Sequence, residues 1–288
     1  MRSKSSAIFV TVLASLLWGS SFPVNKVGVS YVDPYTFAFL RLVMASAAIL
    51  VTAAAMRKLD LSVFRRKIIW GLGILNATGF LLQYIGFVYT TASRSSLLVD
   101  SDVILIAVLS WRIFKERFSI EKKAAVVMGV FGAAFLESGA NLSGLLGGEL
   151  MGDLLVFLSG VVWAFFMVAN KGMITEKADL VTLAVGVQVT TAIALFPFGI
   201  ALGTTGVAAM APEGWAAIIF TGVLCSTAAY LLWSKGLKGL TVTTSAIILL
   251  LEVLWALLLS FTLLGESFSL ISAVGASFIL LSILLASR

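Results

Sequence analysis

Charged side chains inside long apolar stretches are the residues of this sequence most able to do chemistry. Asp102 and Glu252 each interrupt such a stretch, and Arg41 interrupts another. A charge at membrane depth costs about 2.5–3.5 kcal/mol on insertion scales, so it must be paired or used. A carboxylate can exchange a proton or bind an ammonium group, and a guanidinium can bind a carboxylate. The three residues are therefore candidates for coupling or charge docking. For the two acids, structural pairing is the open alternative. For Arg41, an ion pair that fixes the second span against the fourth is the first expectation, and capture of a substrate carboxylate is the alternative.

Asp100 lies two residues before Asp102. On one continuous helix their side chains would point about 200° apart and could not share a proton. Asp100 is therefore expected to face Arg94 or Arg41 as a structural partner. Two more acids are expected at solvated helix ends: Glu137 and Asp153.

Aromatic and amide side chains recur at helical spacing. Trp18 and Asn25 share one helix face, and Trp163 and Asn170 share another. An amide side chain that faced lipid would leave its hydrogen-bonding groups unsatisfied, so these faces should point inward. They can line a cavity or simply hold helices together. The predicted substrate-binding residues are Trp18, Asn25, Gln83, Tyr84, Trp163 and Asn170.

The composition excludes several classes of protein. Hydrophobic residues make up 60% of the 288 residues and charged residues only 12%. A water-soluble domain carries about 25% charged residues, so the outside of this chain must face lipid. Histidine is absent and Cys225 is the single cysteine, which removes the usual ligands for zinc and haem. No metal or cofactor is expected. The net charge of +6 sits in short clusters between apolar stretches, which argues against nucleic acid.

The elements that must position these residues are about ten transmembrane helices of an all-α integral membrane protein. The start of the chain is expected to be a retained first helix rather than a signal peptide. The predicted spans are 6–25, 34–56, 68–90, 95–112, 122–140, 150–171, 179–203, 213–233, 241–264 and 268–287.

The basic residues predict the orientation of these spans. With the N-terminus inside, the outer segments hold only Lys26 and Arg94, while Arg41 lies within a span. All other lysines and arginines then fall on the inner side, which predicts cytoplasmic N- and C-termini in the plasma membrane.

The chain also resembles itself. The stretch from Trp18 to Lys26 aligns with Trp163 to Lys171, and Lys115–Ser119 aligns with Gly265–Ser269. The second alignment also places Asp102 opposite Glu252. Two repeats are predicted, 1–145 and 146–288, each with five spans. An odd number of spans inverts the second repeat in the membrane, an architecture that suits alternating access.

Several short motifs in the chain resemble those of a known protein family. Trp18-Gly-Ser-Ser-Phe22, Phe39-Leu-Arg41 and the two Glu-x-Phe-Ser motifs at 116–119 and 266–269 resemble those of the EamA family. This family belongs to the drug/metabolite transporter superfamily. The resemblance covers the whole chain and implies ten spans as a five-plus-five repeat. It also implies transport of amino acids, their derivatives or other metabolites, often outward.

The predicted function is a secondary transporter for small organic metabolites, with amino acids or related amines as the best candidates and export as the direction. No phosphate-binding Gly-rich loop occurs, so ATP is not the expected energy source. The expected partners are a small-molecule substrate, the lipid bilayer and protons as a coupling ion, with a monomer or a homodimer as the assembly. A channel and an intramembrane enzyme are the alternatives, and an enzyme is not expected.

Overall fold

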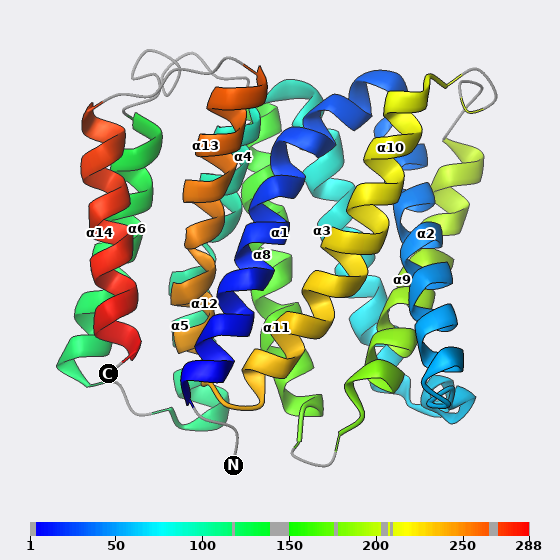
Figure 1. The fold of residues 1–288 in the computed structure, drawn as a ribbon, viewed down its shortest axis with the longest axis horizontal. Helices are drawn as coiled ribbons and strands as arrows, with labels where there is room; N and C mark the ends of the chain where they lie inside the picture. Colours follow the sequence, from blue (N-terminus) through cyan, green and yellow to red (C-terminus); the bar gives the residue numbers. More distant parts are fainter. Residues whose placement is uncertain are drawn as a thin grey trace.

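The computed structural model describes residues 4–116, 119–138, 150–175, 178–202, 207, 210–264 and 270–287, and in them it contains helices and no strands. The helices stand side by side as one bundle (Figure 1). In the N-terminal half they are α1 (Lys4–Tyr31), α2 (Pro34–Ala55), η1 (Leu61–Arg65), α3 (Lys67–Tyr89), α4 (Ala92–Asp100), α5 (Val103–Phe114) and α6 (Ile120–Ser138). In the C-terminal half they are α8 (Leu150–Met173), α9 (Leu180–Ala201), α10 (Pro212–Phe220), η3 (Thr221–Ala228), α11 (Ala229–Leu237), α12 (Val242–Leu249), α13 (Leu251–Leu264) and α14 (Leu270–Ser287).

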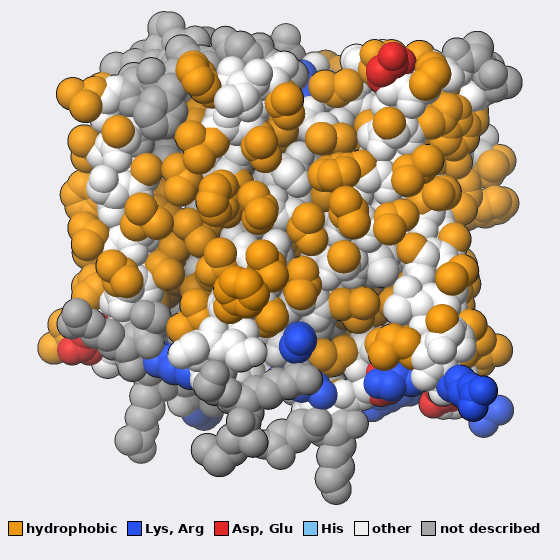
Figure 2. Space-filling view, viewed as in Figure 1, with side chains coloured by type: hydrophobic (Ala, Val, Ile, Leu, Met, Phe, Trp, Pro, Cys, Tyr) orange, Lys and Arg blue, Asp and Glu red, His pale blue; other side chains and the backbone are white. Residues whose placement is uncertain are grey.

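The lengths of the helical stretches show which of them can cross a membrane. Seven helical stretches in the described residues are long and apolar enough to cross a membrane. Large apolar side chains are exposed around the middle of the bundle, and Lys and Arg side chains gather at the end where α1 begins (Figure 2). The chain is therefore a multi-pass membrane protein. Four of the basic residues used for the predicted orientation, Arg2, Arg117, Lys177 and Arg288, lie outside the described residues, as does the repeat boundary predicted at 145.

Short polar side chains determine where several helices begin. Asp33 accepts hydrogen bonds from the backbone N–H groups of Tyr35 and Thr36 at the start of α2. Asp179 does the same at the start of α9. Thr91 and Thr241 cap α4 and α12 through their hydroxyl oxygens. Such caps satisfy amide groups that a helix cannot satisfy itself, so they are readable from local sequence.

Two predicted spans are each divided into two helices. The span predicted at 95–112 breaks between Asp100 and Val103, and the one at 241–264 breaks at Leu250. At the breaks the backbone bonds shorten to a three-residue spacing, from Asp102 N to Val99 O at 3.1 Å and from Val253 N to Leu250 O at 3.3 Å. The stretch from α10 to α11 stays helical but contains the π-helical η3.

Glycines bring the divided helices against their neighbours. A Cβ at Gly19 of α1 would lie 2.8 Å from the carbonyl oxygen of Glu252, and one at Gly160 of α8 would lie 2.6 Å from that of Val99. Both distances are too short for any residue other than glycine. Small residues allow close approach of helices in lipid, and here they position the two acid-bearing helix breaks.

Candidate functional site

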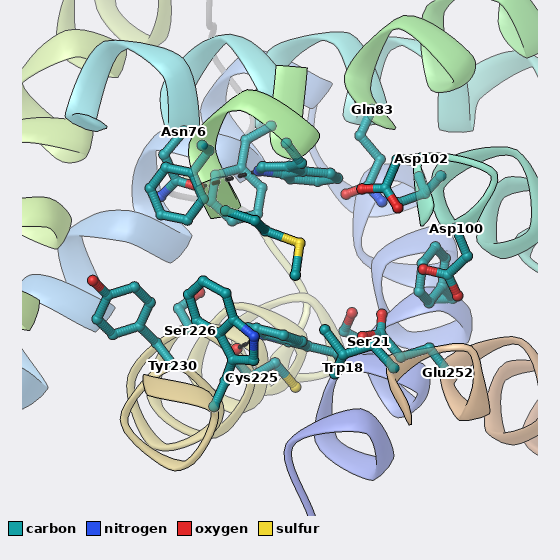
Figure 3. Close-up of a pocket in the computed structure, with 18 of the residues that line it drawn as sticks. Trp18, Ser21, Asn76, Gln83, Asp100, Asp102, Cys225, Ser226, Tyr230 and Glu252 are labelled. Atoms are coloured by element: carbon teal, nitrogen blue, oxygen red, sulfur yellow. Dashed lines mark hydrogen bonds between the residues drawn. The ribbon is translucent and has the colours of Figure 1, made fainter. Parts of the chain in front are cut away.

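A cavity of about 120 Å³ lies inside the bundle. An apolar cavity of about 150 Å³ is known to hold benzene, so this one suits a small organic molecule. Its walls come from both halves of the chain, and its acids Asp100, Asp102 and Glu252 lie toward one side (Figure 3). Its other polar residues include Ser21, Arg41, Asn76, Gln83, Gln188, Ser226 and Tyr230.

The broken fourth span brings Asp100 and Asp102 to the same cavity. Asp100 is the last residue of α4 and Asp102 precedes α5, so the expectation that they point to opposite sides of one helix is wrong. Asp100 is only 7% exposed. Its Oδ2 atom is buried and has no hydrogen-bond partner among the described residues. The predicted pairing of Asp100 with Arg94 or Arg41 is therefore not found.

Glu252 reaches the cavity from the other broken span. It lies in the first turn of α13 and is 6% exposed. Asp102 and Glu252, which the sequence alignment placed at matched positions, both line this cavity. The site thus gathers three acidic side chains, of which Asp100 and Glu252 are buried and Asp102 is partly buried, an arrangement that calls for a cation or a proton.

Arg41 is held by neutral oxygen atoms. Its Nε donates to Ser226 Oγ at 2.8 Å, and its Nη1 donates to Asn25 Oδ1 at 3.2 Å and to the Tyr84 hydroxyl. The guanidinium carbon lies 4.9 Å from the centroid of the Phe80 ring, close enough for a cation–π contact. No ion pair of Arg41 occurs in the described part of the chain, so the predicted pairing with a carboxylate of the fourth span is wrong.

Three tryptophans line the cavity, Trp18, Trp163 and Trp233, and each has its indole N–H group fixed by a hydrogen bond; that of Trp233 donates to Ser245 Oγ at 3.1 Å. Trp18 Nε1 donates to the carbonyl oxygen of Cys225 at 2.7 Å, and Trp163 Nε1 donates to Asn76 Oδ1 at 3.2 Å. Phe80 packs edge-on against Trp163, with ring centroids 5.3 Å apart. These bonds orient the rings, and the parts of the rings that line the cavity can contact an apolar or cationic ligand.

The residues predicted to bind substrate divide into two groups. Trp18, Gln83 and Trp163 line the cavity. Asn25, Tyr84 and Asn170 do not: the first two hold Arg41, and Asn170 accepts a hydrogen bond from the Tyr230 hydroxyl at 2.8 Å. The second group supports side chains that line the cavity.

Several cavity residues were not predicted. Gln188 of α9 donates to the carbonyl oxygen of Ser226 at 3.0 Å and accepts from the Thr227 hydroxyl at 2.9 Å. Gln188 is an amide within the apolar stretch 180–201, so the argument that predicted an inward position for Gln83 could also have identified it. Ser226 gave no such signal, because its position depends on the π-helical turn of η3.

The sequence predicted that Asp153 lies at a solvated helix end, and this prediction is wrong. Its carboxylate pairs with the Arg94 guanidinium and accepts from the Thr90 hydroxyl at 3.0 Å. The two charged side chains are only 13% and 14% exposed. The side chain of Glu137 lies outside the described part of the structure.

Comparisons with known proteins point to one family. The EamA-like transporter family matches residues 5–138 and 150–288. An uncharacterized transporter of Archaeoglobus fulgidus is 28% identical over 96% of this chain and 94% of its own length. The uncharacterized transporter YyaM of Bacillus subtilis is 23% identical over 97% and 93%. A protein of known crystal structure has the same fold, with a TM-score of 0.81, 20% identity, and coverage of 99% of this chain and 98% of that one.

Proposed function

Because this chain belongs to the EamA-like transporter family, we propose that it is a secondary transporter that moves small organic metabolites out of the cell by alternating access. Amino acids or related amines are the proposed substrates. The plasma membrane is the proposed location, with both termini in the cytoplasm, because the basic side chains gather at the end where α1 begins. Protons are the proposed coupling ion, and the assembly is a monomer or a homodimer.

Ten spans follow if each divided helix counts once. The pairs α4–α5 and α12–α13 then each form one span, and α10, η3 and α11 form another. The first repeat would contain five spans before the boundary proposed at 145, and the second would contain five after it. The two stretches that match the family, 5–138 and 150–288, lie on either side of that boundary.

Recurring contacts support an inverted repeat. Lys26 Nζ donates to the carbonyl oxygens of Phe87 and Thr90 near the end of α3. Lys171 Nζ donates to those of Leu237 and Leu240 near the end of α11. The lysines occupy matched positions of the sequence repeat, while α1 runs away from the end where the chain begins and α8 runs toward it (Figure 1). The same contact thus occurs at opposite ends of the bundle.

The observation that carries the proposal is the pair of tryptophan bonds across the cavity. Trp18 of the first half binds the backbone of η3 in the second half, and Trp163 of the second half binds Asn76 in the first. A cavity closed by reciprocal contacts between two halves is the place where alternating access would expose a substrate to each side in turn.

The chemistry of the walls favours substrates with an ammonium group. The three acids can bind a cation, and the tryptophan faces suit an apolar body. The Nη2 group of Arg41 makes no hydrogen bond to a described residue. It can therefore donate to the carboxylate of an amino acid in the cavity. Asp102 and Glu252 are the proposed sites of proton exchange or ammonium docking.

Counterflow in proteoliposomes tests the proposal. A panel of labelled amino acids and amines should give saturable uptake for at least one compound. Ala246→Trp, which fills the cavity, should abolish this uptake, while Val51→Trp on the lipid-facing surface should leave it unchanged. Uptake that survives Ala246→Trp would exclude the cavity as the route, and single-channel currents in place of saturable exchange would indicate a channel.

A further inference from the structure

One partly buried ion pair joins the two halves at the end of the bundle away from the start of α1. Arg94 in the first turn of α4 donates to Asp153 in the first turn of α8, and Asp153 also accepts from Thr90 at 3.0 Å. We call these three residues the outer tie. The charged side chains are 14% and 13% exposed, so water competes little for either one. Separation of the pair would break a charge-assisted hydrogen bond between two side chains that are poorly solvated in the closed state, which costs free energy.

The contacts that cross between the halves at the opposite end are weaker. Glu116 and Lys122 form an ion pair at 2.8 Å, but both belong to the first half. They reach the second half through hydroxyl groups: Thr243 donates to Glu116 at 3.0 Å, and Lys122 donates to Thr241 at 3.2 Å. We call these contacts the inner tie. If the halves separate here, the ion pair stays intact and water replaces two hydroxyl groups.

One ion pair does cross between the halves at this end, between Lys58 and Asp179 at 3.2 Å. Their side chains are 43% and 35% exposed, and ion pairs with that much water around them contribute little. The Thr182 hydroxyl also donates to the carbonyl oxygen of Lys58 at 3.2 Å. Among the described residues, the less exposed ion pair between the halves is therefore the one at the outer end.

We propose that Arg94 and Asp153 form the outer gate of the transport cavity, and that the empty transporter opens to the cytoplasm in preference to the outside. The inference rests on the proposed function, because a gate has meaning only if the cavity alternates between two sides. The two residues act as positioning residues, since they hold α4 against α8 and do not line the cavity. This preference would let an exporter bind its substrate from the cytoplasm. Its size is set by the difference between the free energies needed to break the outer tie and the inner tie.

Cys225 offers a direct test, because the chain's single cysteine lines the cavity. Its reaction with a membrane-impermeant methanethiosulfonate reagent would be followed in spheroplasts, which expose the outer face, and in inside-out vesicles, which expose the inner face. In the wild type the inner rate should exceed the outer rate. Arg94→Gln should raise the outer rate about tenfold, as expected for the loss of one charge-assisted contact, and should lower the inner rate.

Matched variants separate the gate from a general loss of structure. The double variant Arg94→Asp/Asp153→Arg swaps the two charges and should restore the wild-type pattern, in which Cys225 reacts faster from the inner face. Lys58→Gln, which removes the exposed ion pair, should leave the outer rate unchanged. If Arg94→Gln does not fold, Thr90→Val removes only one hydrogen bond of the outer tie and should raise the outer rate about threefold.

The failures can be told apart. An unchanged outer rate in Arg94→Gln and Asp153→Asn, or a double variant that keeps the raised outer rate, would overturn the gate and leave the proposed transport intact. Met167→Cys in a Cys225→Ser background provides a second reporter on the cavity wall. If neither cysteine reacts from either side in any variant, the cavity does not open and the proposed function itself is overturned.

Discussion

The segments α4–α5 and α12–α13 share one backbone plan but carry different charges. Thr91 and Thr241 cap them with the same hydroxyl contact, 3.2 Å to the backbone N–H three residues later. Both segments then break near their middle and place an acid, Asp102 or Glu252, in the cavity. The first segment adds Asp100, whereas the aligned position of the second segment is Leu250.

This difference shows how two segments with the same backbone plan can carry different charges. The break positions a carboxylate in each half, because it ends one helix and begins another beside the cavity. The number of carboxylates then depends on side chains alone. Glu252 is the single acid of its break, while Asp102 has Asp100 beside it. The two halves should therefore respond differently when one acid is removed.

The largest effect is expected from Glu252→Gln, which keeps the shape of the side chain and removes its charge. Transport driven by a pH gradient should fall about 100-fold, equivalent to about 3 kcal/mol, the upper range for a contact with a charged group. Transport by Asp102→Asn should fall less, because the carboxylate of Asp100 remains at that break. The measurement is initial uptake in proteoliposomes with and without the gradient.

The pattern left in Glu252→Gln separates the two proposed roles of this acid. Exchange that continues without acceleration by the gradient would indicate proton coupling. Weak binding of cationic and zwitterionic substrates at every pH would indicate ammonium docking. Wild-type rate, affinity and pH response would show that Glu252 is only a structural partner.

A change at Asp100 converts the first break into a copy of the second. Asp100→Leu should stabilise the protein by about 1–3 kcal/mol, because Asp100 Oδ2 is buried without a hydrogen-bond partner among the described residues. Transport should weaken at the same time. Thermal unfolding in detergent, compared with uptake by the same variant, checks both effects. A fall in Tm would show that Asp100 has a stabilising role.

Trp18 and Trp163, one from each half of the chain, allow the same comparison between the halves for aromatic side chains. Trp163→Ala should weaken substrate affinity about tenfold, because one aromatic face is lost, and the protein should remain folded. Trp18→Ala should also weaken binding, and it additionally removes the 2.7 Å bond to η3. Ligand-induced shifts in Tm would measure the affinities. Unchanged affinity in both variants would remove the tryptophans from the binding site.

The smallest effect is expected for an acid far from the cavity. Burial alone would raise the pKa of Asp179, but hydrogen bonds from Lys58 and from the backbone of Val181 and Thr182 outweigh it, so the pKa lies below its ordinary value. The resulting stabilisation is present above the ordinary carboxyl pKa of about 3.9 and is lost as pH falls through the lowered value. Asp179→Asn keeps a capping side chain and should cost at most about 1 kcal/mol at neutral pH, because the group is partly exposed.

Thermal unfolding from neutral to acidic pH tests this prediction. The difference in Tm between wild type and Asp179→Asn should shrink as pH falls. A constant difference would mean that the charge of Asp179 does not contribute.

The sequence by itself determined the features that depend on local interactions. Apolar length located the helices, and Asp33, Asp179 and the two threonine caps mark where helices begin. The inward direction of Gln83 and Trp163 followed from the high cost of exposing polar groups to lipid. The motifs at Trp18 and Arg41 identified the family, which the comparison with known proteins confirmed.

Only the tertiary structure decided which of these residues meet. The break after Asp100 lies directly against Gly160 of α8, and Glu252 lies directly against Gly19 of α1, both far away in the sequence. The partners of Arg41 likewise come from three other helical segments. Helix formation is driven by neighbours along the chain, so a sequence reveals it. A helix break or a buried polar contact depends on which distant helix fills the space beside it, and that is decided by packing.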